Sequence, residues 1–117
     1  MIIEDDHFLS TVIKARLEKV GLATTQAFDG EEAMGLLKTE KPDLIVLDLI
    51  MPKVTGFEVL EMISKNADLK KIPVVILSHL AQESDIEKAK SLGAKEYFVK
   101  VKVSIDDLVE KVTSLVG

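Results

Sequence analysis

The sequence predicts an α/β domain in which five parallel strands form one sheet with helices on both faces. Short apolar runs recur along the 117 residues, and the segments between them carry apolar residues at helical spacing. This alternation of strand and helix occurs five times, and strands that are separated by helices pair in parallel. Each crossover between the strands is therefore expected to be right-handed.

The five expected strands are short apolar runs, and prolines precede two of them. They lie at 1–3, 22–25, 44–47, 74–77 and 97–99, with Pro42 and Pro73 ahead of the third and fourth. A proline at the start of a strand costs little because few sheet hydrogen bonds need its missing donor. The first run leaves only three residues before an acidic pair, whereas a typical strand has about five or six, so we expect a weakened first strand.

The helices between these strands are marked by apolar stripes and by residues typical of helix ends. Three stripes are clear: Phe8, Val12, Ala15, Leu17 and Val20; Val59, Leu60, Met62 and Ile63; and Leu108, Val112 and Leu115. Segments that begin at Asp29, Thr55 and Ser104 open like helix N-termini, and the first two have the glutamate of a capping box three residues later. Gly21 and Gly93 stand where C-terminal helix glycines belong.

Composition narrows the class of protein. The chain has 47% hydrophobic residues, no cysteine and a net charge of −5. It therefore has no disulfide framework or thiolate metal site, and its charge argues against a nucleic-acid surface. No apolar run approaches the roughly 20 residues that a membrane-spanning helix needs. We expect a single cytoplasmic domain over residues 1–117, with no direct contact with nucleic acid or membrane.

One charged residue interrupts this pattern. Asp48 closely follows the apolar run at 44–47, and a buried carboxylate is costly unless it is paired. Open α/β sheets bind ligands at the carboxyl ends of their strands, which meet at one edge. The other strand ends carry Glu4, Asp5, Asp6, Ser78 and Lys100. The sequence therefore predicts three or four carboxylates, a hydroxyl and an ammonium at one rim, although Asp6 is equally well explained as a helix N-cap.

This set of groups suits phosphoryl transfer with a divalent cation. Carboxylates at close range repel one another unless a cation neutralises them, and oxygen ligands without histidine or cysteine suit Mg²⁺. A lysine and a hydroxyl can offset the charge on phosphoryl oxygens. Because an aspartate carboxylate can form an aspartyl phosphate, we predict that Asp48 is phosphorylated with Mg²⁺ as the cofactor.

The segments that carry these residues resemble the receiver domains of two-component response regulators, in particular those of the chemotaxis-regulator type. IIEDD is similar to the acidic end of the family's first strand, and LIVLDLIMPKVTGFE to its phosphoacceptor segment. PVVILS is similar to its fourth strand, with Ser78 at the switch hydroxyl position, and SLGAKEYFVK is similar to the segment that ends in its lysine, here Lys100. The resemblance covers essentially the whole chain and implies a flavodoxin-like (βα)5 fold with strand order 2-1-3-4-5.

The resemblance implies which residues hold the metal. Asp5 would ligate Mg²⁺ directly, and Glu4 would act largely through water. Asp48 would supply a side-chain oxygen and Ile50 its backbone carbonyl. Asp6 falls outside this set, in agreement with its interpretation as a helix cap.

It also implies the phosphorylation and switching residues. Asp48 would accept the phosphoryl group, assisted by Ser78 and Lys100. Phosphorylation would draw the Ser78 hydroxyl inward and rotate Tyr97, the family's switch aromatic, towards the space that it leaves. The alternative for Tyr97 is a half-buried strand aromatic without a switching role.

The implied partners are proteins. A sensor histidine kinase or a phosphotransfer protein would present phosphohistidine, and the domain would catalyse only its own phosphorylation and dephosphorylation. The readout surface would be the fourth helix, fifth strand and fifth helix, near residues 83–90 and 106–111. It would bind a downstream effector protein or domain, or a second copy in a phosphorylation-dependent dimer.

Two other functions are compatible with the residues. One is a phosphorylation-independent protein-binding scaffold, supported by Val101, which stands where the family usually has a proline in a cis peptide bond. The intact acidic, hydroxyl and lysine set argues against it. The other is a phosphatase with an aspartate nucleophile, which would want a second aspartate at position 50, where this chain has Ile50. It would also want a substrate-covering cap, for which 117 residues leave no room.

Further departures from the family pattern lie beside the site. Ser78 replaces the commoner threonine but keeps the hydroxyl donor. Ile50 and Leu80 are apolar at positions that in the family often orient the attacking water, so we predict slow autodephosphorylation. His7 and His79 are expected to be exposed surface residues without a role in metal binding.

Overall fold

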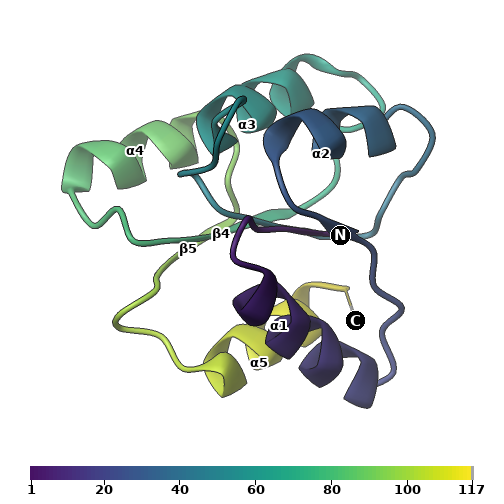
Figure 1. The fold of residues 1–117 in the computed structure, drawn as a ribbon. Coiled ribbons are helices and arrows are strands. Elements are labelled where there is room, and N and C mark those ends of the chain that lie inside the picture. Colours follow the sequence, from purple (N-terminus) through teal and green to yellow (C-terminus); the bar gives the residue numbers. More distant parts are fainter. Residues whose placement is uncertain (117) are drawn as a thin grey trace.

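The structure, a computed structural model, describes residues 1–116 as one parallel sheet flanked by two helical layers (Figure 1). The strand order is β2-β1-β3-β4-β5, and every neighbouring pair is parallel. The strands are β1 (Ile2–Ile3), β2 (Gln26–Ala27), β3 (Ile45–Leu47), β4 (Val74–Ser78) and β5 (Glu96–Val99). The predicted fold class and strand order are confirmed, as is the shortness of the first strand.

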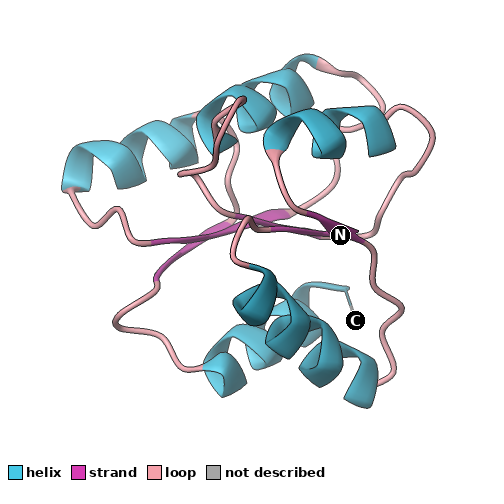
Figure 2. Cartoon of the chain, in the orientation of Figure 1, coloured by secondary structure: helices cyan, strands magenta, loops and turns pink. Residues whose placement is uncertain are grey.

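Helices cover both faces of the sheet. They are α1 (His7–Lys19), α2 (Gly30–Leu36), α3 (Gly56–Lys65), α4 (Glu83–Ser91) and α5 (Ile105–Val116). Figures 1 and 2 show α1 and α5 below the sheet and the other three helices above it. None of these helices in residues 1–116 combines the length and apolar character that crossing a bilayer requires.

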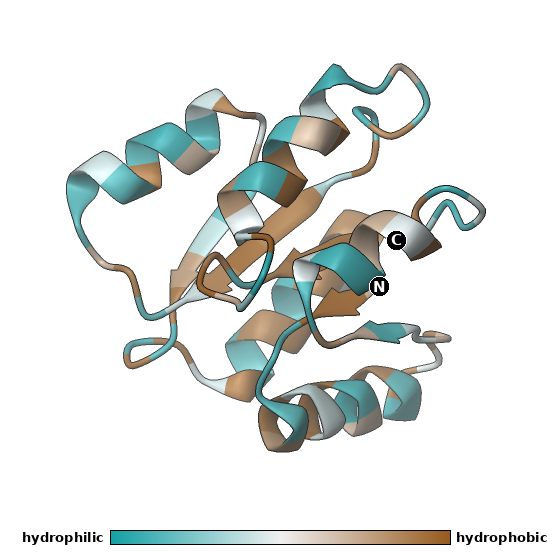
Figure 3. Ribbon diagram, turned by 45° about the horizontal axis from the view of Figure 1, so that its top comes forward, coloured by the Kyte–Doolittle hydropathy of each residue, from teal (hydrophilic) through white to brown (hydrophobic). Residues whose placement is uncertain are grey.

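Two apolar cores result, one on each side of the sheet. Side chains alternate between the faces of a strand, so Ile45 and Leu47 belong to the core under α2, α3 and α4, whereas Val46 belongs to the core with α1 and α5. The inner strands β1, β3 and β4 consist almost entirely of hydrophobic residues, and most hydrophilic residues lie on the helices and loops (Figure 3). Burial of both faces explains why these three inner strands are continuous apolar runs in the sequence.

The second strand lies further along the chain than the sequence predicted. The expected run was 22–25, but β2 is Gln26–Ala27, paired with Ile2 and Ile3 of β1. A strand exists only where a neighbour supplies hydrogen bonds, and β1 begins at Ile2. The Ile2 amide donates to Thr25 O at 2.8 Å. Because β1 does not extend before Ile2, most of the apolar run at 22–25 has no strand to pair with and forms a loop.

Capping follows the sequence closely, with one difference. Thr55 and Glu58 form the full capping box of α3. Asp29 caps α2 by accepting from the Glu32 amide, but the Glu32 carboxylate accepts from the Phe28 amide, one residue before the cap. In the capping box predicted at Asp29, the glutamate therefore bonds one residue earlier than expected. This hydrogen bond fixes Phe28 to the first turn of α2.

Candidate functional site

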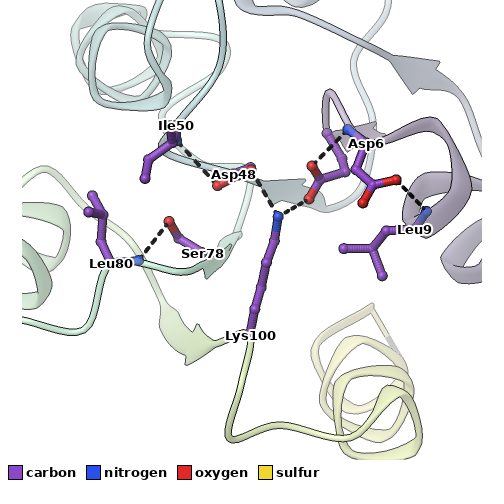
Figure 4. Close-up of polar contacts among 8 residues, drawn as sticks. Asp6, Leu9, Asp48, Ile50, Ser78, Leu80 and Lys100 are labelled. Atoms are coloured by element: carbon purple, nitrogen blue, oxygen red, sulfur yellow. Dashed lines mark hydrogen bonds and ion pairs between the residues drawn. The ribbon is translucent and has the colours of Figure 1, made fainter.

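The carboxyl ends of β1, β3 and β5 bring Glu4, Asp48 and Lys100 together. Lys100 Nζ lies 2.8 Å from Glu4 Oε1 and donates a hydrogen bond of 3.0 Å to Asp48 Oδ2 (Figure 4). Glu4 is 2% exposed and Asp48 is 4% exposed, and the lysine side chain is 10% exposed. One ammonium thus serves two carboxylates that are almost out of contact with water.

Asp5 adds a third carboxylate, and this one faces solvent. One oxygen each from Glu4, Asp5 and Asp48 lie within 4.8 Å of one another. The set contains only hard oxygen donors, which Mg²⁺ prefers. Glu4 Oε1 accepts no well-aligned hydrogen bond within the described residues, although it forms the ion pair with Lys100. The residues therefore fit a divalent cation at the solvent side of the pocket.

Burial and the neighbouring charges shift the pKa values of Glu4 and Lys100. Burial raises the pKa of Glu4 to about 7, against the opposing effects of Lys100 and the Asp6 amide, and the nearby Asp48 charge raises it further. Burial alone would lower the pKa of Lys100, but its interactions with Glu4 and Asp48 outweigh this and raise it. A second cation would relieve the repulsion between the carboxylates.

Ser78 and Tyr97 meet at the loop between β4 and α4. Ser78 is fully buried at the end of β4, and its hydroxyl accepts from the Leu80 amide at 3.3 Å. Figure 4 shows Ser78 and Lys100 on different sides of Asp48. Tyr97 in β5 is half-buried, and its hydroxyl donates to Leu80 O at 2.7 Å. Burial raises the pKa of Tyr97, and the charges of Asp85 and Asp48 add to this effect.

The remaining predicted residues lie around this group. The Ile50 amide donates to Asp48 Oδ1 at 3.2 Å, and the Ile50 side chain is 52% exposed; the role of its carbonyl stays a prediction. Asp6 is the N-cap of α1, with Oδ1 accepting from the Leu9 amide at 3.1 Å, so its interpretation as a cap is confirmed. Both His7 and His79 are exposed, as expected.

The loop after Lys100 reaches the site without a cis peptide. All peptide bonds of residues 1–116 are trans, that between Lys100 and Val101 included. Amides of Lys102 and Val103 donate to Val99 O at 2.9 and 3.2 Å, which closes a turn around the lysine. Val101 itself points outward and is 76% exposed. The departure from proline therefore leaves Lys100 in contact with Asp48.

Sequence reasoning missed the positioning role of Gly56. The sequence places Gly56 at a helix start and at the end of the loop after Asp48, and in the structure a Cβ at Gly56 would lie 2.1 Å from Asp48 O and 2.5 Å from Leu49 Cα. The Gly56 amide also donates to Leu49 O at 2.9 Å. The absence of a side chain thus lets α3 begin directly against the strand end that presents Asp48.

Replacing Gly56 by alanine is therefore expected to destabilise the domain and to disturb Asp48. Overpacking in a packed site typically costs about 1–3 kcal/mol, and the contact here is with backbone that cannot rotate away. Urea unfolding should show this loss of stability, whereas Gly35→Ala, whose Cβ would meet nothing within 4 Å, should be neutral or stabilising. Equal stability of the two variants would contradict the packing argument.

The response regulator receiver domain family matches residues 1–113. The chain is 37% identical over 100 residues to the probable transcriptional regulator ycf27 of Porphyridium aerugineum. The matched region is 86% of this chain and 40% of ycf27. It therefore spans about two fifths of the length of ycf27.

Solved structures agree. The receiver domain of the Francisella response regulator 1452 is 35% identical, with a TM-score of 0.90 over 98% of this chain and 93% of that one. The Mn²⁺-bound form of the response regulator Rcp1 is 31% identical, with a TM-score of 0.84 over 97% of this chain and 89% of that one. The chain therefore belongs to the family of response regulator receiver domains.

Proposed function

We propose that residues 1–117 act as one receiver domain of a two-component system that is phosphorylated on Asp48 by a phosphohistidine donor in the presence of Mg²⁺. The donor would be a sensor histidine kinase or a phosphotransfer protein. The observation that carries the proposal is the environment of Asp48. It is a buried strand-end carboxylate, hydrogen-bonded to Lys100, and it has an oxygen within 4.8 Å of oxygens from Glu4 and Asp5.

The metal would bind on the solvent side of this acidic group. Receiver domains generally bind Mg²⁺ at an acidic pocket, and the Mn²⁺-bound form of Rcp1 is a relative with a divalent cation. Asp5 and Asp48 would hold the ion through side-chain oxygens, Ile50 through its carbonyl and Glu4 largely through water. When bound, Mg²⁺ would neutralise negative charge on the phosphoryl oxygens.

The chain's own residues would carry the transfer. An Asp48 carboxylate oxygen forms a bond to phosphorus while the bond from phosphorus to the donor's imidazole nitrogen breaks, and the nitrogen keeps the electron pair. Lys100 already contacts Asp48 Oδ2 and would offset the charge that accumulates on the phosphoryl oxygens. Ser78 would turn its hydroxyl from the Leu80 amide to donate to one of these oxygens.

That movement would connect the site to a readout surface. Leu80 forms hydrogen bonds with both proposed switch residues: its amide donates to the Ser78 hydroxyl, and its carbonyl accepts from the Tyr97 hydroxyl. Withdrawal of the Ser78 hydroxyl would release the Leu80 amide and allow Tyr97 to reorient. This would bias a pre-existing equilibrium at the surface of α4, β5 and α5, where a downstream effector or a second copy would bind.

Phosphorylation by a small-molecule donor tests the proposal. The protein is incubated with acetyl phosphate and either MgCl2 or EDTA and analysed by intact-protein mass spectrometry. We expect a single phosphoryl adduct that requires Mg²⁺. If no adduct forms while circular dichroism shows an intact fold, the phosphoacceptor function is wrong and a phosphorylation-independent scaffold replaces it.

Once formed, the adduct is expected to be long-lived. Ile50 and Leu80 flank the site, and their apolar side chains cannot hydrogen-bond to a water molecule that attacks the phosphoryl group. Decay of the adduct, followed by mass spectrometry after removal of acetyl phosphate, should therefore be slow. Ile50→Asn should shorten the lifetime, whereas Ile50→Val should not. A lifetime of seconds in the parent protein would contradict the prediction.

A further inference from the structure

A segment that carries none of the predicted site residues contacts the first residue of α1, His7, which lies two positions after Asp5. This segment is residues 28–30, between β2 and α2. The ring of Phe28 stacks on that of His7, with a centroid separation of 3.9 Å and an angle of 16° between the ring planes. The stack therefore lies against the N-terminal end of α1, directly after the turn that carries Asp5.

The same segment also contacts the β3–α3 loop, which follows Asp48. Asp29 Oδ2 lies 3.8 Å from Lys53 Nζ. Gly30 packs so tightly on this loop that a Cβ there would lie 2.4 Å from Val54 O and 2.7 Å from Val54 Cβ. Residues 28–30 therefore contact the start of α1, which follows Asp5, and the loop that follows Asp48.

The loop on this side has a conformation that needs support. Lys53 has a φ of 67°, a left-handed conformation that is unfavourable for a residue with a side chain and persists where neighbouring contacts impose it. The contacts of Asp29 and Gly30 fall on Lys53 and on the next residue, Val54. They are thus placed to hold the loop in the shape that follows Asp48.

Residues 28–30 are themselves fixed to α2. The Phe28 amide donates to Glu32 Oε1 at 2.7 Å, and Asp29 Oδ1 accepts from the Glu32 amide at 2.7 Å. Gly30 is the first residue of this helix. The segment is therefore a firm support rather than a free loop that adapts to its neighbours.

We propose that residues 28–30 are a positioning clamp that sets the spacing of Asp5 and Asp48 and thereby the affinity of the acidic pocket for a divalent cation. This inference rests on the proposed Mg²⁺ site, and it assigns to α2 and its leading residues a part in that site although none of them is a ligand. Groups that orient metal ligands typically change affinity by about 10- to 100-fold when altered.

Two alanine substitutions in the same helix separate the clamp from general effects on α2. Gly30→Ala would push the β3–α3 loop away, whereas Gly35→Ala adds the same methyl group where nothing lies within 4 Å. The dissociation constant for Mg²⁺ is measured by following backbone amide NMR shifts during titration with MgCl2. We expect Gly30→Ala to weaken binding about tenfold and Gly35→Ala to leave it unchanged.

Phosphorylation by acetyl phosphate at varied MgCl2 adds a readout that a purely structural defect would not give. A positioning role predicts that Gly30→Ala raises the half-saturating Mg²⁺ concentration and leaves the rate at saturation near that of the parent. Phe28→Ala removes the ring stack without a clash and should weaken Mg²⁺ binding in the same direction, so it carries the test if Gly30→Ala does not fold.

The outcomes distinguish this inference from the function on which it rests. Mg²⁺ binding by the parent with an unchanged dissociation constant in Gly30→Ala, or in Phe28→Ala if only that variant folds, would overturn the clamp and leave the proposed function intact. A parent that binds no Mg²⁺ would overturn both. Equal weakening by Gly30→Ala and Gly35→Ala would also overturn the clamp, because only one of them reaches the loop.

Discussion

An Asp48→Asn variant is expected to take up no phosphoryl group from acetyl phosphate and Mg²⁺ while keeping its fold. The amide has nearly the shape of the carboxylate, and its oxygen can still accept from the Ile50 amide, which donates to Asp48 Oδ1 in the parent. It is not a nucleophile, however, and cannot form the acyl phosphate. Lys100 keeps its ion pair with Glu4, so the buried ammonium is not left without a partner.

A matched control is available at Asp43, which lies just before β3, whereas Asp48 lies just after it. Asp43 is exposed five residues before Asp48, and Asp43→Asn should be phosphorylated like the parent. Intact-protein mass spectrometry reports the adduct, and circular dichroism with urea unfolding reports the fold. A phosphoryl adduct on the Asp48→Asn protein would move the phosphoacceptor to another residue and contradict the proposed role of Asp48.

Replacing Lys100 by methionine is expected to lower both stability and phosphorylation. Methionine retains much of the volume but leaves Glu4 and Asp48 buried without their shared cation. Removing one partner of a buried ion pair typically costs about 3–5 kcal/mol. Protonation of Glu4, whose pKa is already raised to about 7, would reduce this cost. We therefore expect a loss of about 3 kcal/mol in the free energy of unfolding, measured with urea in EDTA.

Mg²⁺ should partly reverse this loss of stability. A cation that binds only the folded state stabilises it, and the variant lacks the ammonium that repels Mg²⁺ in the parent. The difference in unfolding free energy between Lys100→Met and the parent should thus be smaller in MgCl2 than in EDTA. Lys102→Met changes an exposed lysine two residues further on and should behave like the parent. Equal stability of both variants in EDTA would show that Lys100 is not a structural counterion.

The topology of the sheet and the edge at which its polar residues meet follow from the sequence alone. Continuous apolar runs separated by helical stripes can be buried only between two helical layers, and Ile45, Val46 and Leu47 do alternate between two cores. Because all strands run in parallel, residues that follow them meet at one edge. The meeting of Glu4, Asp48 and Lys100 was therefore predictable from their order in the chain.

The contacts that hold these polar groups in place depend instead on packing between distant segments. The start of β2 depends on its pairing with β1, in which Gln26 lies beside Ile2, 24 residues earlier in the chain. The local apolar pattern around β2 does not indicate this pairing. Gly30 and Gly56 read as ordinary residues of helix starts, but both are in contact with the loop that follows β3. Periodicity and capping are local properties, whereas close packing between distant segments depends on shape in three dimensions, and that is where the spacing of the carboxylates is set.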